Sequence, residues 1–216
     1  MTRSAGWLAG MVAIAAIATI ATTVRAEDAD RLLCYGNDNH GRVKGCTGLI
    51  ERGGVSGEQL AELYFRRALG YSMLGQYATA IADYDVAIKL VPDFAVALNN
   101  RAWAYFRWGK AATGLPDVER SLQLQPTSGN TLDTRAHIRQ TMGDPKGALN
   151  DYTKAMFYGG AEMIKLYQCG LTEARLYEGR VDGIWRPELQ TALERCVLDT
   201  KCDPLPADEH CRPATS

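Results

Sequence analysis

A 34-residue period between about residues 61 and 160 constrains this chain more than any other feature of its sequence. Small, aromatic and turn-forming residues recur, some of them changed, at the same offsets in three successive passes. Such a period is typical of helix–turn–helix repeats that stack into a solenoid, because neither helix of one repeat can bury its apolar face alone. We therefore predict an all-α chain. The three passes contain Tyr71, Gly75, Ala80, Tyr84, Ala87 and Pro92; then Tyr105, Gly109, Gly114, Val118, Ser121 and Pro126; then Arg139, Gly143, Ala148, Tyr152, Ala155 and Gly160.

Within each repeat, small residues mark where the first helix (helix A) and the second (helix B) approach their neighbours closely. The pattern resembles the tetratricopeptide repeat family, with three consecutive repeats over residues 58–160. This resemblance implies a right-handed superhelix of helix–turn–helix repeats, and a protein that binds proteins or peptides instead of catalysing a reaction. The small residues are Ala68, Ala102 and Ala136 in helix A, and Ala80, Gly114 and Ala148 in helix B.

The first 26 residues have the features of an export signal. Arg3 supplies the positive start, residues 7–21 form an apolar core, and residues 24–26 offer small side chains for cleavage. We expect a mature chain that begins near Glu27 and is periplasmic or secreted. The alternative is an uncleaved membrane anchor, although an apolar run of about 15 residues is shorter than the roughly 20 needed to span a bilayer.

The charge balance gives no support to nucleic-acid binding. Without Arg3 and Arg25, the 24 basic residues fall to 22 against 25 acidic ones, a formal charge of −3. Nucleic-acid binding requires a concentrated basic face. No nucleophile, base or metal set converges in the repeats either. We expect no enzymatic activity, no cofactor and, after signal cleavage, no membrane association.

Six cysteines indicate disulfides, because an exported chain reaches an oxidising compartment. An even number fits three bridges, but the sequence alone does not choose among the possible connectivities. The alternative is a zinc site, which lacks the usual paired Cys-x-x-Cys spacing. Local clustering favours the bridges Cys34–Cys46, Cys169–Cys196 and Cys202–Cys211, whereas the zinc alternative uses Cys196, Cys202, His210 and Cys211.

The segment before the repeats, residues 27–57, is predicted to be a helical cap. We expect one helix near Asp28–Tyr35 and another near Val43–Arg52, held together by the Cys34–Cys46 bridge. The cap would cover the outer apolar face of the first repeat, as the end of a solenoid requires.

Helix-start signals agree with the repeat register. Serine and aspartate side chains can accept hydrogen bonds from the first amides of a helix, and proline is tolerated in its first turn. Pro116 falls inside a helix B, where we expect a late start or a kink. The predicted starts are a capping box of Ser56 with Gln59, a cap at Asp93, a cap at Ser128, and Asp144 followed by Pro145.

The resemblance to tetratricopeptide repeats places a peptide-binding groove on the concave face, lined by helix A side chains. Aromatic, arginine and amide groups suit such a groove, since rings give contact area and amides can bond an extended backbone. The alternative for Trp103 and Phe106 is packing between helices. Leu69 and Leu98 stand where a terminal-carboxylate clamp would need polar groups, so we predict no such clamp. The expected groove residues are Phe65, Arg66, Leu69, Ser72 and Met73; Asn99, Asn100, Trp103, Phe106 and Arg107; and Asp133, Thr134, His137, Gln140 and Thr141.

After residue 160 the repeat pattern fails, and residues 161–198 are predicted to form a helical cap. The run Gly179-Arg180-Val181-Asp182-Gly183-Ile184-Trp185-Arg186-Pro187 resembles the central turn of small three-helix peptidoglycan-binding domains, over Ile164–Val197. In this turn we expect the glycines to allow a tight backbone, Asp182 to bond amides within the loop, Val181 and Ile184 to fill the core, and Pro187 to start a helix. Arg186 and Leu189 depart from the family pattern, and cap-only and wall-binding interpretations both remain. Residues 199–216 are predicted to be an irregular tail.

The sequence therefore predicts an exported adaptor that binds an unidentified protein or peptide in its groove. The alternative is a cell-envelope protein that associates with peptidoglycan through its C-terminal segment.

Overall fold

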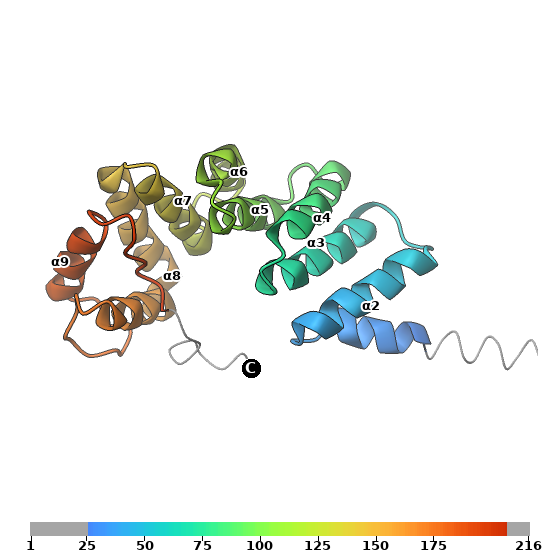
Figure 1. Cartoon of the computed structure of the whole chain (residues 1–216), viewed down its shortest axis with the longest axis horizontal. Coiled ribbons are helices and arrows are strands. Elements are labelled where there is room, and N and C mark those ends of the chain that lie inside the picture. The colour runs from blue at the N-terminus through green and yellow to red at the C-terminus, as the bar shows by residue number, and fades with distance from the viewer. Residues whose placement is uncertain (1–25, 207–216) are drawn as a thin grey trace, which may run out of the picture. The chain divides into compact units, whose positions relative to one another are not determined.

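The computed structural model describes residues 26–206, and these residues form helices with no strand (Figure 1). The all-α prediction is confirmed. Residues 1–25 of the predicted signal peptide and residues 207–216 of the predicted tail lie outside the described residues. The helices span residues 26–35, α2 (Asn39–Arg52), α3 (Gly57–Met73), α4 (Tyr77–Leu90), α5 (Ala95–Arg107), α6 (Ala111–Leu124), α7 (Gly129–Thr141), α8 (Pro145–Glu173) and α9 (Pro187–Cys196).

The chain divides into two compact units, one up to Val91 and the other from Pro92 onwards. In the N-terminal unit α2 packs on α3 and α3 on α4; in the C-terminal unit each helix from α5 to α9 packs on the next. No described helix is long and apolar enough to cross a bilayer.

The predicted repeats correspond to the pairs α3–α4, α5–α6 and α7 with the first part of α8. Gly75, Gly109 and Gly143 occupy the turns within these pairs and have φ of 73°, 75° and 79°, a conformation that favours glycine. Gly160 (φ 62°, ψ −151°) interrupts α8 and ends the third repeat. The recurring glycines therefore reflect a backbone requirement.

The small residues at the repeat positions are buried where helices touch. Ala68, Ala80, Ala102, Ala136 and Ala148 are fully inaccessible to solvent. A Cβ on Gly114 would lie 2.8 Å from the carbonyl oxygen of Ala102, so no larger residue fits there without a shift.

Each repeat also contains an arginine–aspartate pair that joins its two helices. The guanidinium group of helix A donates two hydrogen bonds of 2.6–2.8 Å to one carboxylate of helix B. This bidentate geometry fixes both side chains and is stronger than a single neutral hydrogen bond. Both members recur at the 34-residue period, a signal that the sequence analysis overlooked. The pairs are Arg67–Asp83, Arg101–Asp117 and Arg135–Asp151.

Two of the four predicted helix starts are confirmed. Ser128 accepts a hydrogen bond from the amide of Thr131, and Asp144 accepts one from Gly147 with Pro145 in the first turn. The capping box predicted at Ser56 is wrong. Ser56 is the N-cap residue of α3, but its side chain makes no capping hydrogen bond, and the next residue, Gly57, has a φ of 57°.

The cap predicted at Asp93 is also wrong. Phe94 is the N-cap residue of α5, and the Asp93 carboxylate instead pairs with Arg120 at 2.6 Å. The late start expected near Pro116 is not observed either, because α6 begins at Ala111 and continues through the proline. The proline ring is exposed, so its effect is limited to a missing main-chain hydrogen bond.

The predicted bridge between Cys34 and Cys46 is confirmed. The other two pairings are wrong, because Cys196 bonds to Cys202. The chain turns back directly after α9 and brings their Cα atoms to 5.3 Å, within reach of a disulfide. Cys169 is also disulfide-bonded. The zinc alternative fails because the sulfurs of Cys196 and Cys202 are bonded to each other, and the other two proposed ligands lie outside the described residues.

The loop before α9 is organised by the buried side chain of Gln168. Its Oε1 accepts from the amides of Asp182 and Gly183 at 2.9 and 2.8 Å, and its Nε2 donates to the carbonyl of Ile184 at 2.9 Å. Asp182 accepts from the Ile184 amide and Pro187 starts α9, as predicted. The prediction that Val181 and Ile184 fill the core is wrong: both are exposed, because hydrogen bonds to Gln168 hold the loop.

Candidate peptide-binding site

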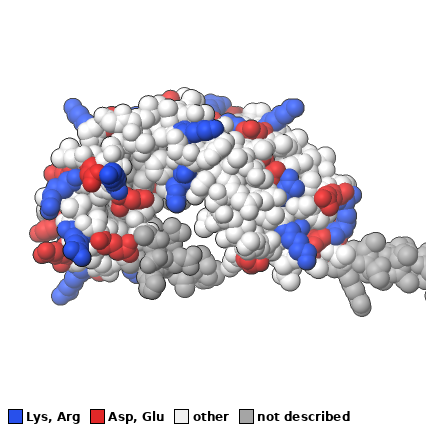
Figure 2. Space-filling view, in the orientation of Figure 1, with Lys and Arg blue, Asp and Glu red and all other residues white. Residues whose placement is uncertain are grey.

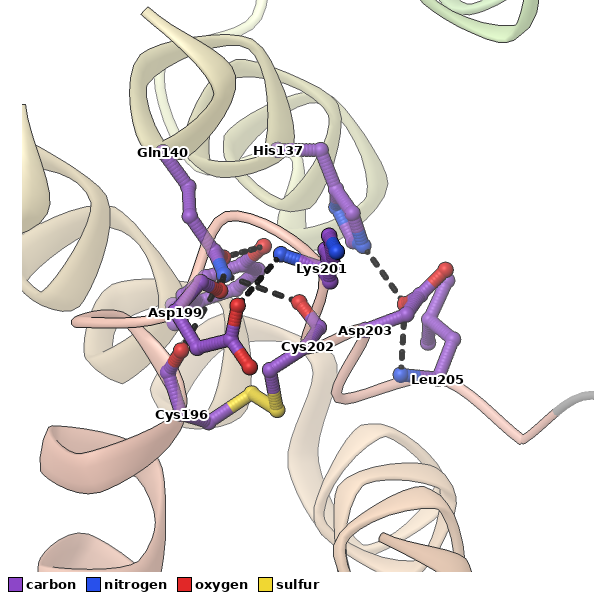
Figure 3. The surroundings of a disulfide bond; sticks show 9 residues. His137, Gln140, Cys196, Asp199, Lys201, Cys202, Asp203 and Leu205 are labelled. Carbon is purple, nitrogen blue, oxygen red and sulfur yellow. Dashed lines mark hydrogen bonds and ion pairs between the residues drawn. A yellow bond between two sulfur atoms is a disulfide. The ribbon is translucent and has the colours of Figure 1, made fainter. Parts of the chain in front are cut away.

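The helix A face of α7, in the third repeat, is covered by the chain's own residues 197–206, which we call the strap (Figure 3). Gln140 of α7 contacts the start of the strap through its amide nitrogen. The Nε2 atom lies 3.2, 2.7 and 2.8 Å from the carbonyl oxygens of Cys196, Asp199 and Cys202. Tyr152 donates to Gln140 Oε1 at 2.9 Å and so fixes the orientation of the amide. One side chain thus holds three main-chain groups of the turn.

His137 lies one helical turn before Gln140 and joins the strap to α7 through a charged contact. Its Nδ1 is 2.9 Å from the main-chain oxygen of Asp133, and its Nε2 is 3.0 Å from Oδ1 of Asp203. Both partners are acceptors, so both ring nitrogens must carry protons and the ring is an imidazolium. Burial alone would lower the pKa of His137, but the carboxylates of Asp133 and Asp203 outweigh it and raise that pKa to about 9.

The charged groups around His137 contact a buried cluster of aromatic side chains. Tyr167 donates to Asp133 Oδ1 at 2.5 Å, and its ring meets that of Tyr152 edge to face at 5.6 Å. Burial, followed by the charge of Asp133, raises the pKa of both tyrosines well above the usual value. Both phenols therefore stay neutral and act as donors at physiological pH.

Asp133 and His137 do not line an open groove, so the prediction for the third repeat is corrected. Thr134 and Gln140 are buried as well, and only Thr141 of the predicted set is exposed. The physical reasons are the strap, which brings Asp203 onto this face, and α8, whose Tyr152 and Tyr167 donate to Gln140 and Asp133. The proline-rich run after Cys202 favours an extended backbone, but nothing in its sequence says where it docks.

The helix A face of α5, in the second repeat, keeps accessible atoms. Trp103 and Phe106 are half-buried with ring centroids 5.0 Å apart, and the Trp103 ring meets His137 edge to face at 5.3 Å. Trp103 thus packs against neighbouring rings and keeps part of its surface accessible. Arg107 is exposed, with its guanidinium carbon 5.7 Å from the centre of the Trp103 ring.

Asn99 adds an unusual polar group to this α5 face. Its Nδ2 donates to Asn100 Oδ1 at 3.2 Å, while its own Oδ1 is buried and accepts no hydrogen bond from the described residues. A buried carbonyl oxygen without a donor is unfavourable by about 1–3 kcal/mol. Because this oxygen is shielded from solvent, an N–H group of a ligand can reach it only if neighbouring side chains move.

The helix A face of α3, in the N-terminal unit, holds the remaining predicted residues. Phe65, Arg66 and Leu69 are half-buried and Met73 is 52% exposed. Arg66 is already engaged, since its guanidinium carbon lies 4.1 Å from the centre of the Tyr35 ring. Of these four residues, Met73 offers the most accessible apolar surface.

The charges on the visible surface are mixed. Figure 2 shows basic and acidic side chains interspersed on the face in view, with no extended region of one sign among the described residues. Charge alone therefore provides no broad electrostatic patch on this face, and recognition depends on particular side chains.

A comparison with protein families identifies the first repeat. Residues 61–94 match the family model described as tetratricopeptide repeat. The match covers most of α3 and all of α4, and its length equals the period of the sequence. Together with the all-helical fold, it supports a tetratricopeptide repeat protein. No curated protein matches the chain.

Proposed function

We propose that this chain is an exported tetratricopeptide repeat adaptor that binds a protein or peptide segment through the helix A face of α5. A tetratricopeptide repeat itself suggests protein–protein interaction. The observation that carries the proposal is the α5 face, where the partly accessible ring of Trp103 lies beside the exposed Arg107.

An extended peptide satisfies each of these groups. Where side chains beside Asn99 move on binding, a main-chain N–H can donate to Asn99 Oδ1 and remove the unfavourable free energy of the unpaired oxygen. An apolar side chain of the peptide can pack on Trp103, and a carboxylate can pair with Arg107. Binding of this kind depends on the main chain and on few side chains.

The proposed location follows from the first 26 residues and from the disulfides. Cys34–Cys46 and Cys196–Cys202 are compatible with an oxidising compartment, as in the periplasm or outside the cell. A periplasmic or secreted protein is therefore our proposal.

Capture of partners by the tagged mature chain tests the proposal. Trp103→Ala and Asn99→Ala should each reduce capture of the partner at least about tenfold, the scale of a central interface residue. Trp108→Ala is the matched control, because Trp108 is an exposed tryptophan just beyond α5 that stacks on Lys110. If the first two variants captured every partner as well as wild type, the α5 face would not be the binding site.

A second candidate function is association with peptidoglycan through the loop before α9. Ile184 and Trp185 are 59% and 49% exposed on a loop that the buried Gln168 holds in place. Sedimentation with purified sacculi tests this candidate: Trp185→Ala should lower the bound fraction, and Leu198→Ala, at another exposed apolar position, should not. A wild-type chain found wholly in the supernatant contradicts it.

A further inference from the structure

The strap lies on α7 in the manner of a bound peptide. Gln140 contacts the main-chain carbonyl groups of Asp199 and Cys202 in the strap, and that of Cys196 at the end of α9. The side chain of Asp203 stays 52% exposed, although that of its partner His137 is only 3% exposed. The helix therefore provides the buried half of the contact, and the strap contributes a carboxylate that reaches in from solvent.

With the strap in place, the His137 imidazolium, the Asp133 carboxylate and the Arg107 guanidinium give the surroundings of Asp203 one net positive charge, which Asp203 neutralises. The imidazolium of His137 has one carboxylate on its own helix, with Nδ1 3.6 Å from Oδ2 of Asp133. Arg107 of α5 adds a second cation. Partial burial opposes ionisation of Asp203, but the hydrogen bond from His137, the charge of His137 and that of Arg107 lower the pKa of Asp203. A ligand for this face must bring a carboxylate.

We infer that the helix A face of α7 is a binding site for an aspartate-bearing peptide segment that turns directly after the aspartate, and that the strap is its resident ligand. This inference rests on the proposed peptide-binding function of the helix A faces and names the chemistry of one ligand. The chain's own Asp203-Pro204-Leu205-Pro206 shows the form that fits, since Pro204 and Pro206 are buried and Asp203 meets His137.

The resident segment is favoured by its covalent connection. The disulfide between Cys196 and Cys202 closes one residue before Asp203, and it holds that carboxylate near His137 at a high effective concentration. An external acidic segment therefore competes poorly with the intact strap. Loss of the disulfide and of the Asp203 carboxylate should open the site.

Binding of a labelled peptide to the full mature chain tests the inference. The probe is a fluorescent peptide of residues 199–206 with Cys202→Ser, measured by fluorescence anisotropy. The opened chain carries Cys196→Ala, Cys202→Ala and Asp203→Ala. The matched control carries the same cysteine changes with Glu194→Ala, which removes an exposed carboxylate of α9 instead.

The opened chain should bind the probe at least about tenfold more tightly than the control, which lacks the disulfide but keeps the Asp203 carboxylate, because a hydrogen bond to a charged group is worth about a factor of ten or more. Wild type keeps both and should bind the probe most weakly. A second probe that also carries Asp203→Asn should bind the opened chain about tenfold more weakly than the first. Equal binding of the two probes, or an opened chain with a wild-type circular dichroism spectrum that binds no better than wild type, overturns the inference. Should the opened chain lose its helical signal, the single variant Asp203→Ala takes its place and must still bind the probe more tightly than Glu194→Ala.

These outcomes are separate from those of the capture experiment. If the probe fails while partner capture still depends on Trp103, the α7 inference falls and the adaptor function stands. If the probe binds as expected while no partner depends on Trp103, the adaptor function falls and the α7 site remains.

Discussion

At the scale of single residues, His137 attaches the strap to α7 through its contact with Asp203. Its ring is buried between a carbonyl and a carboxylate that both accept hydrogen bonds, so the folded chain holds it as a cation. Desolvation of this charge is unfavourable, and the two aspartates compensate for it. The strap is therefore attached through a group whose charge depends on pH.

We predict that His137 titrates at a pKa of about 9, above its ordinary value of about 6.5. Because the folded state binds the proton more tightly than the unfolded state, the stabilisation from this group is complete below pH about 6.5 and is lost as the pH rises through about 9. NMR of the imidazole signals measures the pKa directly. The difference in unfolding free energy between wild type and His137→Gln should shrink over the same pH range, and a pKa near 6.5 contradicts the buried cation.

Gly170 is a second residue on which the strap depends. A Cβ at this position of α8 would collide with main-chain atoms of Pro204 and Leu205. Alanine is normally the better helix former by about 1 kcal/mol, so Gly170→Ala should stabilise the helix unless the strap lies against it.

We predict that Gly170→Ala instead lowers the melting temperature and accelerates hydrogen exchange of the Leu205 amide, which donates to Asp203 in the wild-type chain. Thr172→Ala is the control, an exposed position on the same helix that should leave the exchange of Leu205 unchanged. An unchanged exchange rate in Gly170→Ala would place the strap elsewhere.

At the scale of helices, the arginine–aspartate pairs join helix A to helix B in each repeat. The pair Arg101–Asp117 is largely shielded, with side chains 19% and 13% exposed. Shielded bidentate pairs leave an uncompensated charge when one partner is lost. Exposed pairs such as Arg120–Asp93 contribute about 0–1 kcal/mol at most.

Arg101→Ala should therefore lower the free energy of unfolding by about 1.5–3 kcal/mol, and Arg120→Ala by less than about 1 kcal/mol. Denaturant unfolding of both variants measures the difference. Equal decreases in the free energy of unfolding would mean that the shielded pair stabilises the repeat no more than the exposed pair does.

The features of the fold that could be predicted from the sequence are those that depend on local or periodic signals. Turn glycines such as Gly109 require a particular φ, and small residues such as Ala102 meet a neighbouring helix, so both recur with the period. The arginine and aspartate pairs recur in the same way and were predictable. The Cys196–Cys202 bridge and the contact between His137 and Asp203 were not, because both depend on how the chain turns back after α9.

At the scale of the whole molecule, the helix A faces of the repeats differ in whether they are accessible or covered by the strap. The helix A faces of α3 and α5 keep accessible side chains, whereas that of α7 is occupied by the strap. The proposed binding of an external partner therefore uses the helix A face of α5 as long as the strap is in place. Within the third repeat, the predicted groove residues of α7 are covered by the chain's own strap.

The most direct measurement is site-specific photo-crosslinking of the full mature chain in its native compartment. A photoreactive amino acid replaces either Arg107, exposed on the helix A face of α5, or Glu119, exposed on α6. The account predicts covalent adducts with a partner protein from position 107 and none from position 119. Adducts from position 119 alone would contradict binding through the helix A face.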